Sequence, residues 1–131
     1  MTNDLKARTK RFAVDVIRFC STLNIKSDVR FISNQLLRAA TSVGANYRAA
    51  CRSKSKADFI NKLSIVEEEA DESEYWFELL ENLPVPRTPE LLRLKDEAHQ
   101  LVAIMIQSKK TARATGTPTR TEDLRFSIRN S

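Results

Sequence analysis

Residues 59–80 carry apolar or small side chains at alternating intervals of four and three positions. An α-helix places such positions on one face, so this spacing predicts a helix that packs a continuous seam against its neighbours. The seam consists of Phe59, Leu63, Val66, Ala70, Ser73, Phe77 and Leu80. No other feature of the chain constrains the fold as strongly, and it points to an all-α protein.

Three further segments repeat this helical period. The first seam contains Leu5, Phe12, Val16, Phe19 and Leu23, widened by Ala13, Ile17 and Cys20. The second contains Ile32, Leu36, Ala39, Ala40, Val43, Tyr47 and Ala50. The last contains Leu91, Leu94, Ala98, Leu101, Met105, Ser108 and Ala112. Short connections between long amphipathic helices favour antiparallel neighbours, so we expect an up-down-up-down four-helix bundle over residues 1–114.

Start signals stand before three of these segments. Ser27 is the expected N-cap of the second helix, because it follows a break rich in turn residues. Ser55, followed three positions later by Asp58, resembles a capping box. Thr88 and Pro89 predict the last helix start, with a cap and a proline at the first helical position.

The few turn residues agree with this fold. The 131 residues include only 2 glycines and 4 prolines, too few for a β-sandwich or a Rossmann unit. Gly44 lies inside the second helical segment and marks a close approach between helices. Cys20 and Cys51 form no CxxC pair, which favours reduced thiols. Neither a secretory signal nor a membrane-spanning run is visible, so we expect a cytoplasmic protein that does not associate with membranes.

Charge is strongly segregated along the chain. Residues 1–60 carry 12 Lys+Arg and 4 Asp+Glu, whereas residues 61–99 carry 4 and 11. The predicted nucleic-acid-binding residues are Arg38, Arg48, Arg52, Lys54 and Lys56. Such a cluster can neutralise phosphates and release counterions without reading sequence. The alternative is a solvated face, or a face that pairs with the acidic residues of another subunit.

No catalytic or metal-binding motif stands out. A di-metal centre in a helical bundle needs two Glu-x-x-His motifs, and the chain has one histidine, His99. A pairing of His99 with Cys20 or Cys51 is the only arrangement resembling a nucleophile and a base. We therefore expect a protein that is not an enzyme and has no metal or other cofactor.

Apolar residues beyond the seams indicate self-association. A helix in a single bundle needs one apolar face, yet further large apolar residues flank the third and fourth seams. We expect an oligomer interface that includes Trp76, Leu79, Val102 and Ile106. Residues 115–131 form a basic tail in which Leu124, Phe126 and Ile128 alternate with polar residues. We expect this tail to be flexible; the alternative is an extended segment that pairs with a neighbouring subunit.

Three stretches make the sequence recognisable. They are Ser42-Val43-Gly44-Ala45-Asn46-Tyr47-Arg48-Ala49-Ala50-Cys51-Arg52, Ser55-Lys56-Ala57-Asp58-Phe59-Ile60-Asn61-Lys62-Leu63-Ser64-Ile65 and Glu69-Ala70-Asp71-Glu72-Ser73-Glu74-Tyr75-Trp76-Phe77-Glu78-Leu79-Leu80. They closely resemble the four-helix-bundle family encoded in intervening sequences of 23S rRNA genes, also called the S23 family. The resemblance covers roughly residues 5–112, and the family is similar to the accessory variability determinant of diversity-generating retroelements.

The resemblance implies a four-helix protomer that assembles into a ring-like homopentamer and binds RNA or a reverse transcriptase. Two hypotheses follow. The first is an oligomeric protein that binds structured RNA through its basic face. The second is a structural or adaptor homo-oligomer that binds another protein, such as a retroelement reverse transcriptase.

Overall fold

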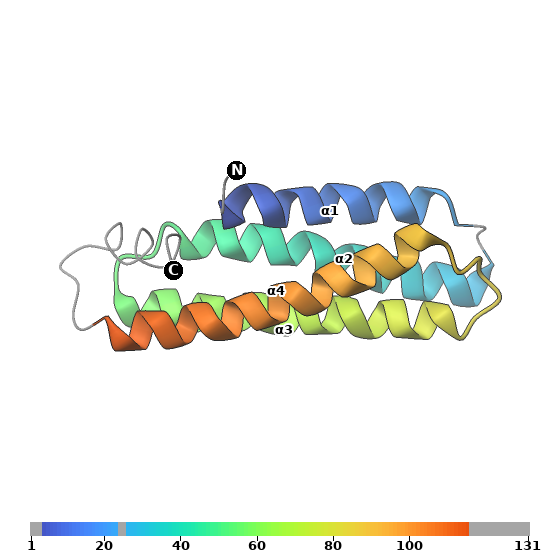
Figure 1. Cartoon of the computed structure of the whole chain (residues 1–131). Coiled ribbons are helices and arrows are strands. Elements are labelled where there is room, and N and C mark those ends of the chain that lie inside the picture. Colours follow the sequence, from blue (N-terminus) through green and yellow to red (C-terminus); the bar gives the residue numbers. More distant parts are fainter. Residues whose placement is uncertain (1–3, 24–25, 116–131) are drawn as a thin grey trace.

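The computed structural model describes residues 4–23 and 26–115 as an antiparallel bundle of four α-helices. They are α1 (Leu5–Ser21), α2 (Ser27–Ala50), α3 (Lys56–Glu81) and α4 (Pro89–Ala114). The connections α1–α2 and α3–α4 lie at one end of the bundle, and the α2–α3 connection lies at the other (Figure 1). The predicted all-α four-helix bundle is confirmed. The tail expected to be flexible lies, from residue 116 on, outside the described residues.

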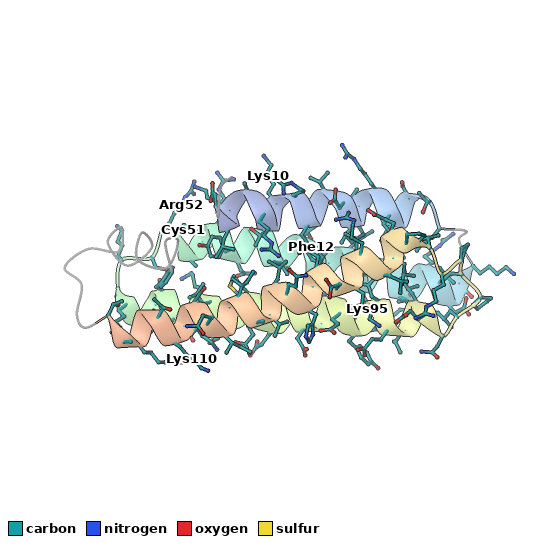
Figure 2. The ribbon with its side chains drawn as sticks, viewed as in Figure 1. Lys10, Phe12, Cys51, Arg52, Lys95 and Lys110 are labelled. Carbon is teal, nitrogen blue, oxygen red and sulfur yellow. The ribbon has the colours of Figure 1, made fainter. Side chains whose placement is uncertain are left out.

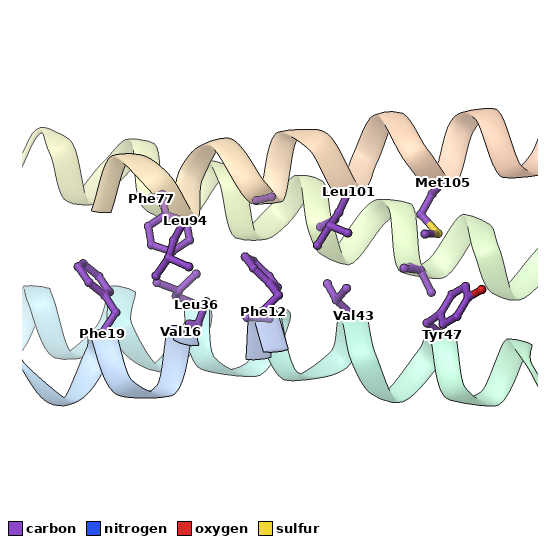
Figure 3. Close-up of a cluster of buried hydrophobic side chains, with 14 of the residues drawn as sticks. Phe12, Val16, Phe19, Leu36, Val43, Tyr47, Phe77, Leu94, Leu101 and Met105 are labelled. Carbon is purple, nitrogen blue, oxygen red and sulfur yellow. The ribbon is translucent and has the colours of Figure 1, made fainter. Parts of the chain in front are cut away.

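The four predicted seams meet in one core. Every seam residue of α2, α3 and α4 is buried, and the aromatic and aliphatic side chains converge between the helices (Figure 3). Removing these apolar surfaces from water is the main force that stabilises the bundle. One prediction for α1 is wrong: Ile17 was expected to widen the seam but is 48% exposed. It lies one position after Val16, which turns it about 100° away from the core.

The helix starts follow local hydrogen bonding. The Ser55 hydroxyl accepts a hydrogen bond from the Asp58 N–H at 3.1 Å, and the Thr88 hydroxyl accepts one from the Leu91 N–H at 3.2 Å, so both predicted caps are confirmed. The prediction for α2 is wrong by one residue. Lys26 is its N-cap, without a side-chain cap bond, and Ser27 is already helical.

The glycine of α2 fixes how α1 and α2 sit against each other. A Cβ added to Gly44 would lie 3.3 Å from the Thr9 carbonyl oxygen, so the two helix backbones approach closely, as predicted. Because the helices are antiparallel, this contact brings the start of α1 to the level of the last turn of α2. The two segments, far apart in the sequence, therefore share one end of the bundle.

Candidate nucleic-acid interface

The outer face of the α1–α2 pair is rich in cations and poor in acids. From Val29 to Ala50, α2 contains no Asp or Glu. On α1, Cys20 lies within 4.0 Å of the Ser33 carbonyl oxygen, which identifies the side of α1 that faces α2. Lys6 lies two heptads before Cys20 and therefore on the same side, and Lys10 is one turn further along. Both lysines are exposed.

Three of the predicted binding residues gather where α2 ends. Arg48, Arg52 and Lys54 are exposed. The helical turn continues past Ala50, because the Arg52 N–H donates to the Ala49 carbonyl at 3.0 Å. Arg52 therefore stays on the same face as Arg48, one turn further on. Cations at this position also interact favourably with the negative end of the helix dipole.

We call Lys6, Lys10, Arg48, Arg52 and Lys54 the basic surface. Among residues 4–23 and 26–115, no carboxylate oxygen lies within 4.0 Å of any of these five cations. Figure 2 shows Lys10 and Arg52 on the α1 side of the molecule, with Lys110 on the opposite side. The surface is therefore a one-sided concentration of positive charge at the α2–α3 end of the bundle.

The other two predicted residues make contacts of their own. Arg38 lies about 15 Å from Arg48 along α2. Its guanidinium pairs with Glu72 and, at 3.4 Å, with Glu69. The hydrogen bond to Glu72 is the main cause of the raised pKa of Arg38. Lys56 donates from Nζ to the Arg113 carbonyl oxygen at 3.2 Å and so ties the start of α3 to the end of α4.

Sequence reasoning missed Lys6 and Lys10 as members of this surface. The sequence shows that Lys6 occupies the same heptad position as Cys20. It does not show which residues of α1 lie opposite which residues of α2. Tyr47, which lies beside Arg48 in the sequence, is only 5% exposed and belongs to the core. Its ring face is therefore not presented for stacking on a base.

The acidic residues of α3 lie mostly against neighbouring helices. Three glutamates spaced by seven residues face α4, where Glu67 pairs with Lys109 at 2.7 Å, Glu74 with His99 at 3.1 Å and Glu81 with Lys95 at 2.6 Å. Glu69 and Glu72 face α2 through Arg38. Only the outward positions remain for solvent, and these carry the exposed side chains of Glu68, Asp71 and Glu78.

The four predicted interface residues lie on two different seams. Trp76 contacts Phe31 of α2. Leu79 lies seven residues after Glu72, which pairs with Arg38, so Leu79 also lies on the side of α3 that faces α2. Val102 lies seven residues after Lys95 and seven before Lys109. Both lysines pair with glutamates of α3, so Val102 lies on the side of α4 that faces α3. Ile106, one turn further along α4, is 38% exposed. Trp76, Leu79 and Val102 are half-buried and pack against the core of their own chain. The structure therefore does not bring these four residues together in one patch.

The described residues assemble no evident reaction centre. Within residues 4–23 and 26–115, no group of three or more His, Cys, Asp or Glu side chains could hold a metal ion. Cys20 is buried, and burial raises the pKa of its thiol, which disfavours the reactive thiolate. No helix in the described part is both long and apolar enough to cross a membrane.

These features define a small all-helical bundle with a basic surface at one end. The chain belongs to the 23S rRNA-intervening sequence protein family, whose profile matches residues 2–107. It is similar to the crystal structure of a protein of unknown function from the S23 ribosomal protein family of Bacteroides thetaiotaomicron VPI-5482. The two are 36% identical, with a TM-score of 0.73, over 81% of this chain and 98% of the other. No curated protein matches the chain.

Proposed function

We propose that the protein is a non-enzymatic homo-oligomer that binds nucleic acid, in particular structured RNA, through the basic surface. The observation that carries this proposal is the five-cation surface, in which no charged group lies within 4.0 Å of a described carboxylate oxygen. Seven other described lysines and arginines pair with carboxylates within the chain, such as Arg8 with Glu97 at 2.8 Å. Cations left without acidic partners are the ones that gain most from contact with phosphates.

Binding of this kind depends on charge and shape. The basic surface consists of five cationic side chains and presents no exposed ring for stacking on bases, so we expect its main contacts to be with the phosphate backbone. Five phosphate contacts correspond to a slope of log affinity against log salt of about −3.5 for single strands and about −4.5 for a duplex. Assembly of several protomers would present several such surfaces at once and convert weak contacts into avidity.

The test is fluorescence anisotropy with a labelled structured RNA over a salt series. The variant R48E/R52E removes the centre of the basic surface and should lose most of the affinity at low salt. The matched control K110E/R113E makes the same change in net charge on two exposed residues of α4. Equal losses in both variants would indicate a response to overall charge. An unchanged affinity of R48E/R52E would show that the basic surface is not the binding site.

A structural or adaptor role is the second candidate. The observation that favours it is the number of large apolar side chains on the surface, including Phe31 at 58%, Tyr75 at 51% and Leu92 at 39% exposure. Exposed aromatic residues are typical of the centres of protein–protein interfaces. Failure of the protein to bind structured RNA at low salt, with its assembly intact, would favour this role over the first.

A further inference from the structure

Three aromatic side chains form a cluster on the outer face of α2 and α3, at the end of the bundle opposite the basic surface. The Trp76 ring lies 6.4 Å from the Phe31 ring and 5.2 Å from the Tyr75 ring, measured between centroids, in edge-to-face arrangements. Phe31 is 58% exposed and Tyr75 is 51% exposed. We call Phe31, Tyr75 and Trp76 the aromatic surface.

The aromatic surface is preorganised. The Trp76 indole N–H donates to a Glu72 carboxylate oxygen at 2.9 Å, so its one polar group is satisfied within the chain. A ligand would therefore meet a fixed Trp76 ring, and burying that ring would lower the free energy without leaving its donor unpaired.

Carboxylates flank this surface. Glu68, Asp71 and Glu78 are exposed on α3, and no cation among residues 4–23 and 26–115 pairs with any of them. From Leu63 to Glu81, α3 carries no Lys or Arg. The surface is therefore bordered by negative charge on its α3 side, while Arg30 lies beside Phe31 on α2. Such an α3 border fits a segment that combines apolar side chains with arginines.

Such a segment is present at the end of this chain. Between positions 124 and 129, Leu124, Phe126 and Ile128 alternate with Arg125, Ser127 and Arg129, directly after the acidic pair Glu122 and Asp123. In an extended backbone, successive side chains point to opposite faces, which would place the three apolar side chains on one face over about 13 Å. We propose that residues 119–131 of one copy bind to the aromatic surface of a second copy.

The position of α4 assigns the contact to a second copy. Its last turn lies beside the α2–α3 connection, since Lys56 bonds to the Arg113 carbonyl. The aromatic surface is at the other end, with Phe31 about 28 Å from Ala50 along α2. Residues 115–123 span at most about 30 Å when fully extended, which leaves no slack for crossing from α4 to α2. In a second copy, the distance from this tail to the aromatic surface is not fixed by the length of α2.

The segment also lies beyond the part of the chain shared with the family. The family profile ends at residue 107, and the similar crystal structure is covered over 98% of its own length by 81% of this chain. The proposed contact is therefore an addition of this sequence to the common bundle. It stands independently of nucleic-acid binding by the basic surface.

Trp76 is the one tryptophan of the chain, so its fluorescence reports directly on this contact. In the full-length variant L124S/F126S/I128S, the Trp76 emission maximum should shift to the red and acrylamide quenching should increase. The control T119S/T121S alters the same segment without touching its apolar side chains and should behave like the unmodified protein. Equal quenching in L124S/F126S/I128S and the control would overturn the proposal.

A second measurement identifies the copy that is contacted. A photo-crosslinking residue replaces Phe126, and unlabelled and ¹⁵N-labelled full-length proteins are mixed in denaturant and refolded together before irradiation, so that both isotopes enter the same oligomers. Crosslinks from position 126 to residues near Phe31 or Tyr75 should join light to heavy chains. Crosslinks confined to one isotope would overturn the assignment to a second copy, and crosslinks only to other regions would overturn the site.

Discussion

The Lys95 ammonium lies 2.6 Å from Oε1 of Glu81 and joins the end of α3 to the start of α4. Glu81 is the last residue of α3, where the helix dipole disfavours a negative charge. Lys95 offsets this unfavourable position, assisted by Arg87, whose guanidinium lies 3.0 Å from Oε2 of the same carboxylate. The hydrogen bond from Lys95 is the main cause that lowers the pKa of Glu81 below its usual range.

This pair predicts a pH-dependent contribution to stability. Because the pKa of Glu81 is lower in the folded than in the unfolded chain, its contribution is complete above the unfolded value and is lost as the pH falls below about 4.3. Lys95→Met should reduce the free energy of unfolding at pH 7 by about 0.5–1 kcal/mol, as is usual for a surface ion pair. The measurement is urea denaturation at pH 7 and pH 3.

At pH 3 the difference between Lys95→Met and the unmodified protein should shrink. The control is Lys110→Met, an exposed lysine with no carboxylate partner among the described residues. Its effect should be small at both pH values. A Lys95→Met difference that is as large at pH 3 as at pH 7 would show that altered packing around residue 95, rather than the charge pair with Glu81, is responsible.

The close contact at Gly44 limits the size of the side chain that fits between α1 and α2. Gly44→Ala removes an intrinsic helix penalty of about 1 kcal/mol but places a methyl group against the Thr9 carbonyl, so the two effects should nearly cancel. Gly44→Leu cannot fit at this contact and should destabilise the protein by about 1–3 kcal/mol. Thermal unfolding of both variants tests this. A leucine variant as stable as the unmodified protein would show that α1 can move away from α2 at little cost.

Lys6 and Lys10 should contribute to nucleic-acid binding although they lie far from Arg48 in the sequence. K6Q/K10Q should make the salt slope of RNA binding shallower by about 1.4–1.8. The measurement is the anisotropy salt series, with Lys110→Gln as the single-site control. A slope equal to that of the unmodified protein would restrict the basic surface to the end of α2.

Self-association should depend on the aromatic surface. Trp76→Arg places a charge among Phe31 and Tyr75 and should reduce the mass in solution toward the 14.9 kDa of one chain. Analytical ultracentrifugation measures this, and circular dichroism confirms that the helices remain. Ile106→Arg tests the α3–α4 seam separately. An unchanged mass for Trp76→Arg would remove Trp76 from the interface.

The fold was largely predictable because each helix carries its own period and boundary signals. The seam from Phe59 to Leu80 required only the spacing of apolar residues, and Ser55 and Thr88 identified helix starts from their local chemistry. Ile17 was misplaced because an apolar residue beside a seam has the same appearance in the sequence whether it is covered or exposed. Its exposure depends on how far α2 and α4 wrap around α1, which is a tertiary property.

The candidate site was less predictable, because it depends on which charges are neutralised by other helices. Nothing near Arg38 in the sequence indicates that Glu69 and Glu72, 31 and 34 positions later, will pair with it. The same limitation applies to Trp76 and Val102, whose separation onto two seams depends on which side of α3 each neighbouring helix occupies. Local patterns identify helix faces, whereas surfaces arise only after the faces are assembled.

The unequal packing of the four helices has a consequence for local unfolding. α1 is the shortest helix and packs mainly on α2, whereas α3 packs extensively on both of its neighbours. Detachment of α1 should therefore require less free energy than opening of α3, and its amides should exchange hydrogen for deuterium sooner. Because Lys6 and Lys10 leave with α1, the basic surface exists only while α1 is docked. A ligand that contacts both α1 and α2 would therefore slow hydrogen exchange in α1 and stabilise its packing on α2.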